Sequence, residues 1–462
     1  MMPNVHLIGI GGAGLSAIAT VLLQQGYQVS GSDLQASTTT ARLEALGATV
    51  YIGQRAENLS PAIDTVIVSS AVSTTNPELQ AARQLGLTVC KRDQWLGQMM
   101  AGYEGIAVAG THGKTTTTAM TAFMLERLGQ NPTYIVGGFI PQLDRNAAAG
   151  TGRAFVIEAD EYDHMFLGLR PTVAVVTIVE WDHPDIFPTP ERLYQAFTDF
   201  VQLVPADGLV IGCGDAPGVD IVTRSAQAPV VTYGLQADND WQAVEVTPNE
   251  RGGSDFGVVR AGELAVTVSL AVPGWHNVQN ALAALVVAGH QQLNLPAAAA
   301  ALGEFQGTSR RFELKGEVNG VTVIDDYAHH PTEIRATLAA ARTRFGSRPI
   351  WAVLQPHTFS RTLTLLTDFA NAFDDADHVI VVDIFPSREK DEGLVSSQDM
   401  VSRMVHPDAR YIGSLAEAAD VLAAGLAPDD VLLTLGAGDG YKVGEWVLDK
   451  IAHRKENTND ET

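Results

Sequence analysis

The chain has 462 residues, with 30 Lys and Arg against 53 Asp and Glu and a formal net charge of −23. A chain this acidic lacks the basic face that nucleic-acid binding requires, so we expect no nucleic-acid partner. No apolar run approaches the roughly 18 residues of a membrane span, and no basic flank of a signal peptide opens the chain. We therefore expect a cytoplasmic protein that does not bind membranes. The length predicts about three domains.

The first domain, expected over residues 1–103, alternates apolar strand patterns with helical ones, which predicts a buried parallel sheet. Strands are predicted at residues 5–10, 27–33 and, as the third, 65–69. The first runs into Gly9-Ile10-Gly11-Gly12-Ala13-Gly14, a G-x-G-x-x-G loop that lets the backbone approach a diphosphate at a helix N-terminus. Asp33 follows where an acidic side chain would meet a sugar hydroxyl. The loop alone leaves NAD, a nucleotide sugar and a simple packing turn open.

A second phosphate-binding loop opens the next domain, expected over residues 104–311. An apolar strand at 106–109 leads into Gly110-Thr111-His112-Gly113-Lys114-Thr115 and then a helix. Backbone amides of such a loop hold phosphates, Lys114 reaches the terminal oxygens, and Thr115 can bind Mg²⁺. The full Walker spacing fails because its first glycine would fall at Val108, which leaves the shorter G-x-x-G-K-T. Residues 230–270 are polar and rich in β-formers, and they predict an antiparallel extension of the sheet.

Carboxylates and a histidine follow two further strands of this domain. Glu158-Ala159-Asp160-Glu161 ends one strand, and Glu180-Trp181-Asp182-His183 ends another. Because parallel strands present ligands at their carboxyl ends, these side chains predict a divalent-metal site beside the phosphate loop. Either cluster alone would equally suit a solvated strand end or a helix cap. Together with Lys114 they favour metal-assisted phosphoryl transfer.

Amides and guanidinium groups precede the third domain, which is expected over residues 312–454 and followed by a flexible tail at 455–462. Asn277 and Asn280 share one face of a starting helix, and amides can read an adenine edge. Arg310 and Arg311 suit a γ-phosphate. Two strand-end segments of the third domain, 325–333 and 355–362, carry Asp, His and Arg, and they predict a substrate site.

These motifs, in this order, resemble those of the Mur ligase family over nearly the whole chain. The resemblance implies an α/β protein with three-domain Mur ligase architecture: a Rossmann-like N-terminal domain for a UDP-sugar, a central P-loop ATPase domain, and a Rossmann-like C-terminal domain that brings the amino acid. It implies an ATP- and Mg²⁺-dependent amide ligase of peptidoglycan precursor synthesis, acting as a monomer or weak homodimer. Several family members use a carbamoylated lysine as a metal ligand, but this chain has no Lys between Lys114 and Lys315. That absence favours the alanine-adding branch, which joins L-alanine to the lactoyl carboxylate of UDP-N-acetylmuramate through an acyl phosphate.

The resemblance also implies roles by motif position. ATP would contact Gly110, Thr111, His112, Gly113, Lys114, Thr115, Thr116, Asn277, Asn280, Arg311 and Asp326. The sugar nucleotide would contact Gly11, Gly12, Gly14, Asp33 and Ser69, and L-alanine would contact Tyr327, His329, His357 and Arg361. The metal ligands would be Thr115, Glu158 and His183, and the catalytic groups Lys114, Glu158, His183, His329 and Arg361.

Three other functions remain to be weighed. A family member that attaches a whole tripeptide to the same sugar nucleotide would suit the segment 158–163, but the first glycine loop and the segment 355–362 favour the alanine enzyme. Thr358 departs from the arginine that is frequent at its position in the family, and the segment 388–393 lacks the usual Pro-Ile nearby. A NAD-dependent dehydrogenase would leave the second phosphate loop unexplained. A non-catalytic nucleotide-binding regulator would leave the two histidine clusters without a role.

Overall fold

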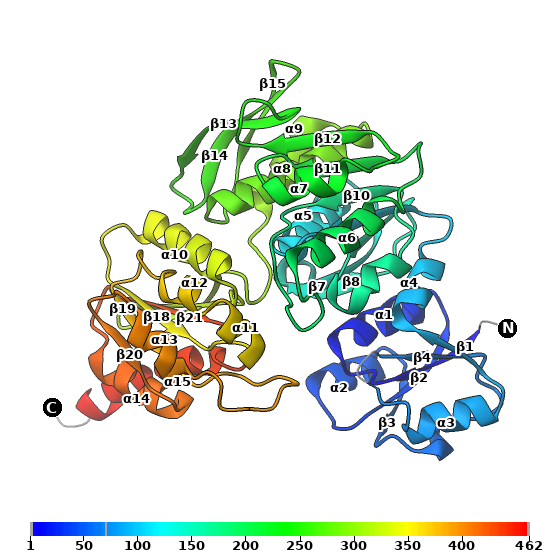
Figure 1. The fold of residues 1–462 in the computed structure, drawn as a ribbon, viewed down its shortest axis with the longest axis horizontal. Helices are drawn as coiled ribbons and strands as arrows, with labels where there is room; N and C mark the ends of the chain where they lie inside the picture. The colour runs from blue at the N-terminus through cyan, green and yellow to red at the C-terminus, as the bar shows by residue number, and fades with distance from the viewer. Residues whose placement is uncertain (1–2, 70–71, 460–462) are drawn as a thin grey trace.

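The computed structural model describes residues 3–69 and 72–459, and it divides them among three β-sheets (Figure 1). The chain forms an α/β protein of three domains, each built around one sheet with helices packed on it. Among the described residues, no helix has both the length and the hydropathy needed to cross a bilayer.

The N-terminal domain is a five-stranded parallel sheet in the order β3-β2-β1-β4-β5. Strands β1 and β4 are apolar and buried at its centre, as a sheet covered on both faces requires. Its elements are β1 (Asn4–Ile8), α1 (Ala13–Gln24), β2 (Gln28–Asp33), α2 (Thr38–Ala45), β3 (Thr49–Ile52), β4 (Thr65–Val68), α3 (Pro77–Gln84), β5 (Thr88–Lys91) and α4 (Arg92–Met99).

The central domain is a ten-stranded sheet in the order β15-β14-β13-β12-β11-β10-β6-β9-β7-β8. Its elements are β6 (Glu104–Ala109), α5 (Lys114–Arg127), β7 (Thr133–Ile140), β8 (Arg145–Ala148), β9 (Ala154–Glu158), the 3-10 helix η3 (Tyr162–Gly168), β10 (Val173–Val176), α6 (Pro190–Val201), β11 (Leu209–Cys213), α7 (Pro217–Thr223), β12 (Val230–Gly234), β13 (Trp241–Pro248), β14 (Ser254–Arg260), β15 (Glu263–Ser269), α8 (Trp275–His290) and α9 (Leu295–Glu304).

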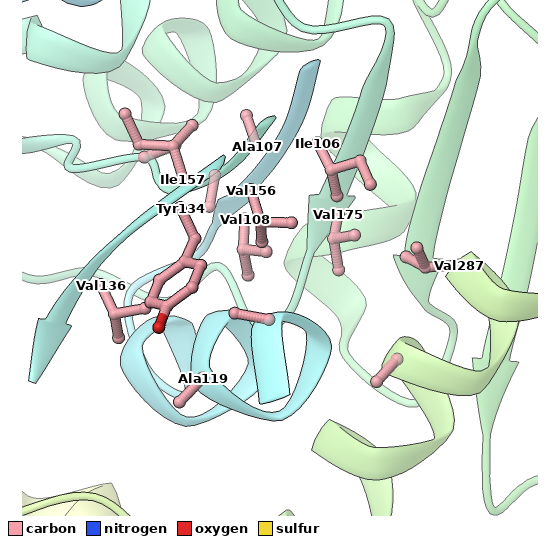
Figure 2. Packing of buried hydrophobic residues seen from close by; sticks show 14 of the residues in the cluster. Ile106, Ala107, Val108, Ala119, Tyr134, Val136, Val156, Ile157, Val175 and Val287 are labelled. Carbon is pink, nitrogen blue, oxygen red and sulfur yellow. The ribbon is translucent and has the colours of Figure 1, made fainter. Parts of the chain in front are cut away.

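The core of the central domain lies between its parallel strands and helix α5. Strand β6 pairs in parallel with both β9 and β10, so the carboxyl ends of all three strands meet at one edge. Figure 2 shows Val108, Val156 and Val175 of these strands close to α5, which carries Ala119; all four are fully buried. This packing fixes the start of α5, and with it the phosphate loop, against the ends of β9 and β10.

The antiparallel extension predicted for residues 230–270 is confirmed for β13, β14 and β15, which pair as a meander. Strand β12 differs, because it pairs in parallel with both β11 and β13. The extension therefore begins one strand later than predicted.

The C-terminal domain is a six-stranded sheet in the order β16-β17-β21-β18-β19-β20, parallel except for β16. Its core is separate from the core shared by the other two domains. Its elements are β16 (Glu313–Val318), β17 (Val321–Asp326), α10 (Pro331–Phe345), β18 (Ile350–Leu354), α11 (Phe359–Thr364), α12 (Leu366–Ala370), β19 (His378–Val381), α13 (Ser397–Arg403), β20 (Ala409–Tyr411), α14 (Leu415–Gly425), β21 (Val431–Leu435) and α15 (Tyr441–Asn459).

The number of strands in the first domain differs from the sequence prediction. The sequence predicts residues 65–69 as the third strand, but they form β4, because β3, a four-residue edge strand with mostly exposed side chains, precedes them. The sequence predicts a flexible tail at residues 455–462. Helix α15 continues to Asn459, and the flexibility of the tail stays a prediction. Residues 460–462 lie outside the described part of the chain.

The first two domains meet through a close backbone approach. Helix α4 packs on η3, and a Cβ added at Gly97 would lie 2.2 Å from the carbonyl oxygen of Gly168. A side chain at either glycine would separate the two elements, since an added Cβ at Gly168 would also lie 2.8 Å from the backbone of Asp93. The start of α4 is thereby held beside the central domain.

Candidate active site

The phosphate loop lies between β6 and α5 and depends on two glycines. Gly110 has φ +142° and Gly113 has φ +81°, a region that favours glycine. A Cβ at Gly110 would lie 2.0 Å from Thr177 Oγ1, and one at Gly113 would lie 2.9 Å from Asn280 Oδ1. The loop is held to the end of β10, where the Thr111 N–H donates to Ile178 O at 2.7 Å.

Lys114 is enclosed by its own loop and by a carboxylate to which the sequence assigns no role. Its Nζ donates to Gly110 O at 2.6 Å and forms an ion pair with Glu161 at 2.8 Å. Glu161 is fully buried. Burial opposes its charge, but Lys114 and His183 outweigh burial and keep the pKa of Glu161 below its ordinary value. Lys114 therefore remains charged and ready to exchange these partners for phosphate oxygens.

Thr115 and Glu158 lie together, as the predicted metal site requires. Thr115 Oγ1 donates to Glu158 Oε1 at 2.9 Å, and the Gly137 N–H donates to Glu158 Oε2 at 2.7 Å. Burial, only partly offset by Lys114, raises the pKa of Glu158 above its ordinary value. A cation beside this carboxylate would offset the free-energy cost of burying its negative charge. Hydroxyl and carboxylate oxygens are ligands that Mg²⁺ prefers. The pair fits the predicted ion.

His183, the third predicted metal ligand, lies among different partners. Its Nε2 is 3.6 Å from Glu161 Oε1 and 3.7 Å from Asp182 Oδ2. Burial would lower the pKa of His183, but Asp182 and Glu161 outweigh burial and raise it. Through Glu161, His183 is linked to Lys114.

Seven of the eleven predicted ATP residues line one pocket between the central and C-terminal domains. His112, Gly113, Thr116, Asn277, Asn280, Arg311 and Asp326 all line it, together with Thr177, His276 and Glu333. The pocket is continuous with the phosphate loop and has apolar and amide groups at its far end. It has the form expected for a nucleotide.

The two asparagines also tie the pocket together. Asn280 Oδ1 accepts from Thr117 Oγ1 at 3.0 Å, and its Nδ2 donates to Asn277 Oδ1 at 3.1 Å. Asn277 in turn donates to Pro273 O at 2.7 Å. These bonds link α5 to α8. The asparagines therefore hold the two helices together, independently of their predicted contact with adenine.

Asp326 lies at the end of β17, with its carboxylate facing two backbone N–H groups. Those of Phe312 and Ala328 donate to it at 2.7 and 2.8 Å. Burial nevertheless raises the pKa of Asp326 to about 6, in spite of Arg311. Arg310, by contrast, is bound within the C-terminal sheet, donating to Asp325 Oδ2 at 2.9 Å and to Gly436 O at 2.8 Å.

A buried cluster that the sequence analysis did not single out joins the phosphate loop to the C-terminal domain. His112 Nδ1 is 3.1 Å from Glu333 Oε1 and its Nε2 is 2.5 Å from Glu180 Oε1, while His330 Nδ1 is 3.2 Å from Glu180. Burial would lower the pKa of His112, but Glu333 and Glu180 outweigh the effect of burial and raise this pKa to about 10. Among the described residues, one set of three histidine and carboxylate side chains is close enough to share a metal ion, and it consists of His112, Glu180 and His330. A protonated His112 already balances these carboxylates.

The residues predicted to bind an amino acid share a second cavity. Tyr327, His329, His357, Thr358 and Arg361 line it from the C-terminal domain, and Asp160, Tyr162, His183 and Asp185 line it from the central domain. Arg361 Nε donates to Asp182 Oδ1 at 2.8 Å, and its Nη1 lies 3.4 Å from His357 Nδ1. The cavity therefore places a guanidinium and two imidazoles beside the phosphate loop.

The glycine loop of the N-terminal domain has the predicted strand-loop-helix setting. Asp33 Oδ2 accepts from the Gly11 N–H at 2.9 Å, and a Cβ at Gly11 would lie 2.8 Å from that oxygen. Gly12 directly precedes α1. Ser69 lies beside Gly9, because a Cβ added at Gly9 would be 3.7 Å from the Cβ of Ser69. Asp33 thus holds the loop itself, and its predicted contact with a sugar hydroxyl stays a prediction.

The sequence analysis gave Glu161, Asp182, Glu180 and Glu333 no individual role, although all four lie in the clusters it identified as a metal site or a substrate site. Their positions at strand ends and at a helix start indicated that these carboxylates belong to a site. The sequence did not indicate which carboxylate of each cluster is buried. The segment 388–393, noted only as a departure, contributes Arg388 and Glu389 to the amino-acid cavity.

Comparison with known proteins agrees with this architecture. Three family models match in chain order: "Mur ligase family, catalytic domain" over residues 4–104, "Mur ligase middle domain" over 108–288, and "Mur ligase, glutamate ligase domain" over 310–438. The chain belongs to the Mur ligase family.

Within the family, the chain is similar over its full length to curated proteins named UDP-N-acetylmuramate–L-alanine ligase. The protein of Roseiflexus castenholzii is 45% identical, with 96% of this chain and 97% of that protein covered. The protein of Caldanaerobacter subterraneus subsp. tengcongensis is 42% identical, with 97% of each covered.

Two solved structures are also similar. UDP-N-acetylmuramate-alanine ligase MurC of Thermotoga maritima matches with a TM-score of 0.81 at 29% identity, covering 98% of this chain and 99% of that one. The murein peptide ligase of Psychrobacter arcticus matches with a TM-score of 0.72 at 26% identity, covering 97% and 98%.

Proposed function

We propose that this chain joins L-alanine to the lactoyl carboxylate of UDP-N-acetylmuramate at the expense of ATP, yielding UDP-N-acetylmuramoyl-L-alanine, ADP and phosphate. The observation that carries the proposal is a chain of contacts from the phosphate loop to the amino-acid cavity. Lys114 pairs with Glu161 at 2.8 Å, Glu161 lies 3.6 Å from His183, and His183 lies 3.4 Å from Arg361. A phosphate-binding lysine and an amino-acid cavity thus belong to one site.

The first half of the reaction transfers the γ-phosphoryl group of ATP to the sugar carboxylate. Both reactants are anions, so the site must offset their repulsion. Lys114 belongs to the phosphate loop, where its Nζ donates to Gly110 O, and Arg311 lines the pocket that begins at His112 and Gly113 of the same loop. Mg²⁺, when held by Thr115 and Glu158, would supply further positive charge there.

The second half requires an uncharged amine. Free alanine carries an ammonium group, which must lose a proton to solvent before the amine attacks the acyl carbon and displaces phosphate. Burial, with His329 and Arg361 nearby, lowers the pKa of His357 to about 3, so this imidazole is uncharged at neutral pH. Burial also lowers the pKa of His329. Two neutral imidazoles beside Arg361 can orient the amine and accept its hydrogen bonds, while the guanidinium attracts the alanine carboxylate.

The tripeptide ligase is the second candidate, favoured by the similarity to the Psychrobacter arcticus protein. The identities of 42% and 45% to alanine ligases over the full chain support the alanine reaction more strongly. Consumption of ATP and a UDP-sugar is consistent with action in the cytoplasm.

A substrate panel tests the proposal. Phosphate release is measured with UDP-N-acetylmuramate and Mg·ATP in the presence of L-alanine, glycine, L-serine or the tripeptide. We expect turnover with L-alanine. Turnover with the tripeptide but not with L-alanine would instead assign the second function, and an absorbance change with NAD in the absence of ATP would reject the ligase class.

A further inference from the structure

A third cavity separates the N-terminal and central domains on the side of the glycine loop. Its lining combines the glycine-loop end of α1, the start of α4, the middle of β7 and the end of β9; it includes Ala13, Gly14, Arg92, Gly137, Glu158 and Asp160. One end is therefore the loop predicted to hold a diphosphate, and the other is the carboxylate that contacts Thr115. A sugar nucleotide held by the loop would extend along this cavity toward the phosphate loop.

Arg92 is the only Lys or Arg among the described residues that line this cavity. It is the first residue of α4, directly after β5, and its guanidinium lies on the glycine loop: a Cβ added at Gly14 would be 1.8 Å from Nη1. The third glycine of the G-x-G-x-x-G motif here makes room for a guanidinium. A positive charge is thereby brought to the N-terminal end of α1, where anions are already favoured.

The guanidinium is partly buried, and its partners are a carboxylate at long range and a thioether. Its side chain is 23% exposed, and Nη2 forms an ion pair with Asp160 Oδ2 at 3.6 Å. Within the described part of the chain, the other acceptor recorded for it is Met165 Sδ. A thioether is a weak acceptor, so the contact with sulfur replaces little of the hydration that the charged group gives up. The N–H groups that face Met165 are thus available for a stronger acceptor.

The electrostatics agree with this geometry. Burial lowers the pKa of Arg92 below its ordinary value, although Asp160 and Asp93 act in the opposite direction. The nearby acids therefore offset only part of the free-energy cost of burying this charge. An oxyanion bound in the cavity would offset more of that cost and would make charge-assisted hydrogen bonds to the planar guanidinium.

We propose that Arg92 binds the diphosphate of the sugar nucleotide, together with the backbone N–H groups of the glycine loop. The diphosphate is favoured over the sugar carboxylate because the guanidinium lies against Gly14 at the start of α1, at the glycine-loop end of the cavity. Binding exchanges the sulfur of Met165 for phosphate oxygens and leaves Asp160 at the edge. The inference rests on the proposed function, because it takes a UDP-sugar as the substrate.

Direct binding to the full-length protein tests this role apart from catalysis. Titration calorimetry with UDP, uridine, UDP-N-acetylmuramate and ATP is carried out on the wild type and on Arg92→Gln. We expect the affinity for UDP and for UDP-N-acetylmuramate to fall about 10- to 100-fold, with ATP and uridine binding unchanged, since a hydrogen-bonded charge pair contributes this much. Arg83→Gln, at an exposed position of α3 in the same domain, should bind UDP as the wild type does.

Two further variants separate binding from folding. Arg92→Lys keeps the charge but not the planar fork, so it should recover only part of the UDP affinity. Gly14→Ala keeps the arginine but displaces its guanidinium, so it should lose UDP affinity as Arg92→Gln does.

Unchanged UDP binding by Arg92→Gln would overturn the proposal. So would a loss confined to UDP-N-acetylmuramate, which would assign Arg92 to the carboxylate. If the wild type binds neither UDP nor UDP-N-acetylmuramate, the proposed function itself fails, and the role of Arg92 fails with it.

Discussion

Arg361 of the C-terminal domain donates from Nε and Nη2 to one oxygen of Asp182 in the central domain, at 2.8 and 2.7 Å. Both side chains are almost completely buried, at 4% and 3% exposure. Burial opposes the charge of Asp182, but Arg361 outweighs it and holds the pKa of that carboxyl well below its ordinary value. The amino-acid cavity is therefore built across two domains, with its guanidinium oriented by the domain that holds the phosphate loop.

Asp182→Asn should impair the use of alanine. The substitution keeps the shape of the side chain but leaves Arg361 buried with an unpaired charge, which costs about 2 kcal/mol or more. We expect kcat/KM for L-alanine to fall at least about 30-fold while ATP affinity stays within roughly twofold. The control is Asp220→Asn, which removes an exposed partner of Arg224 and should change little. Unaltered alanine kinetics in Asp182→Asn would show that the pair does not orient the cavity.

Lys114→Ala should abolish ATP-dependent phosphate release. Removing a cation aimed at developing phosphate charge costs at least about 100-fold in rate. Steady-state assays of phosphate release measure the loss, and circular dichroism checks that the fold is retained. Lys315→Ala, which removes a lysine paired with Glu445 in the C-terminal domain, is the matched control. Near-normal activity of Lys114→Ala would contradict the assignment of the phosphate loop.

Gly110→Ala should destabilise the protein and weaken nucleotide binding together. Its φ of +142° disfavours a side chain, and the new Cβ would meet Thr177 Oγ1 at 2.0 Å and Ile178 O at 3.0 Å. Gly102→Ala carries a comparable backbone penalty at φ +87° but has nothing within 4 Å of the new Cβ. Thermal unfolding should show a modest loss for Gly102→Ala, on the order of 1 kcal/mol, and a larger one for Gly110→Ala. Equal losses would mean that the close approach to β10 is unimportant.

The His112 cluster should make stability depend on pH. Because the folded-state pKa of His112 is raised to about 10, its protonation stabilises the folded state fully below the unfolded pKa of about 6.5. That contribution falls as the pH rises from about 6.5 and is lost above about 10. Urea unfolding of the wild type and of His112→Gln, followed by tryptophan fluorescence, should show a difference in unfolding free energy that shrinks across this range. A difference independent of pH would contradict a charged His112.

Much of the site could be predicted because its residues lie in short contiguous motifs. Gly110–Thr115 specifies a strand-loop-helix turn through its glycines, and seven of the eleven residues predicted to bind ATP line one pocket. The pairing of Thr115 with Glu158 was also expected, since Thr115 lies in the first turn of the helix that follows β6 and Glu158 ends the neighbouring strand β9. Local sequence carries such information because the turn and the sheet edge are set by nearby residues.

The inward-facing carboxylates were not predictable in the same way. Glu158 and Glu161 are the same residue type, three positions apart, yet Glu158 contacts Thr115 and Glu161 pairs with Lys114. Asp163 and His164, with φ of 54° and 56°, turn the chain directly after them. Which carboxylate becomes buried depends on where the phosphate loop packs, and that contact joins residues 47 positions apart.

The sequence by itself determined the three α/β domains and the two glycine loops between a strand and a helix, because periodicity and glycine spacing act locally, and the order of its motifs carried the resemblance to the Mur ligase family. Only the tertiary structure decided that Arg361 is oriented by Asp182, that His112 lies between carboxylates of two domains, and that Arg92 covers Gly14. These relationships join residues far apart in the chain, 179 positions for Arg361 and Asp182, and they exist only after the sheets have packed. Burial then fixes the charges of these groups, which no local pattern encodes.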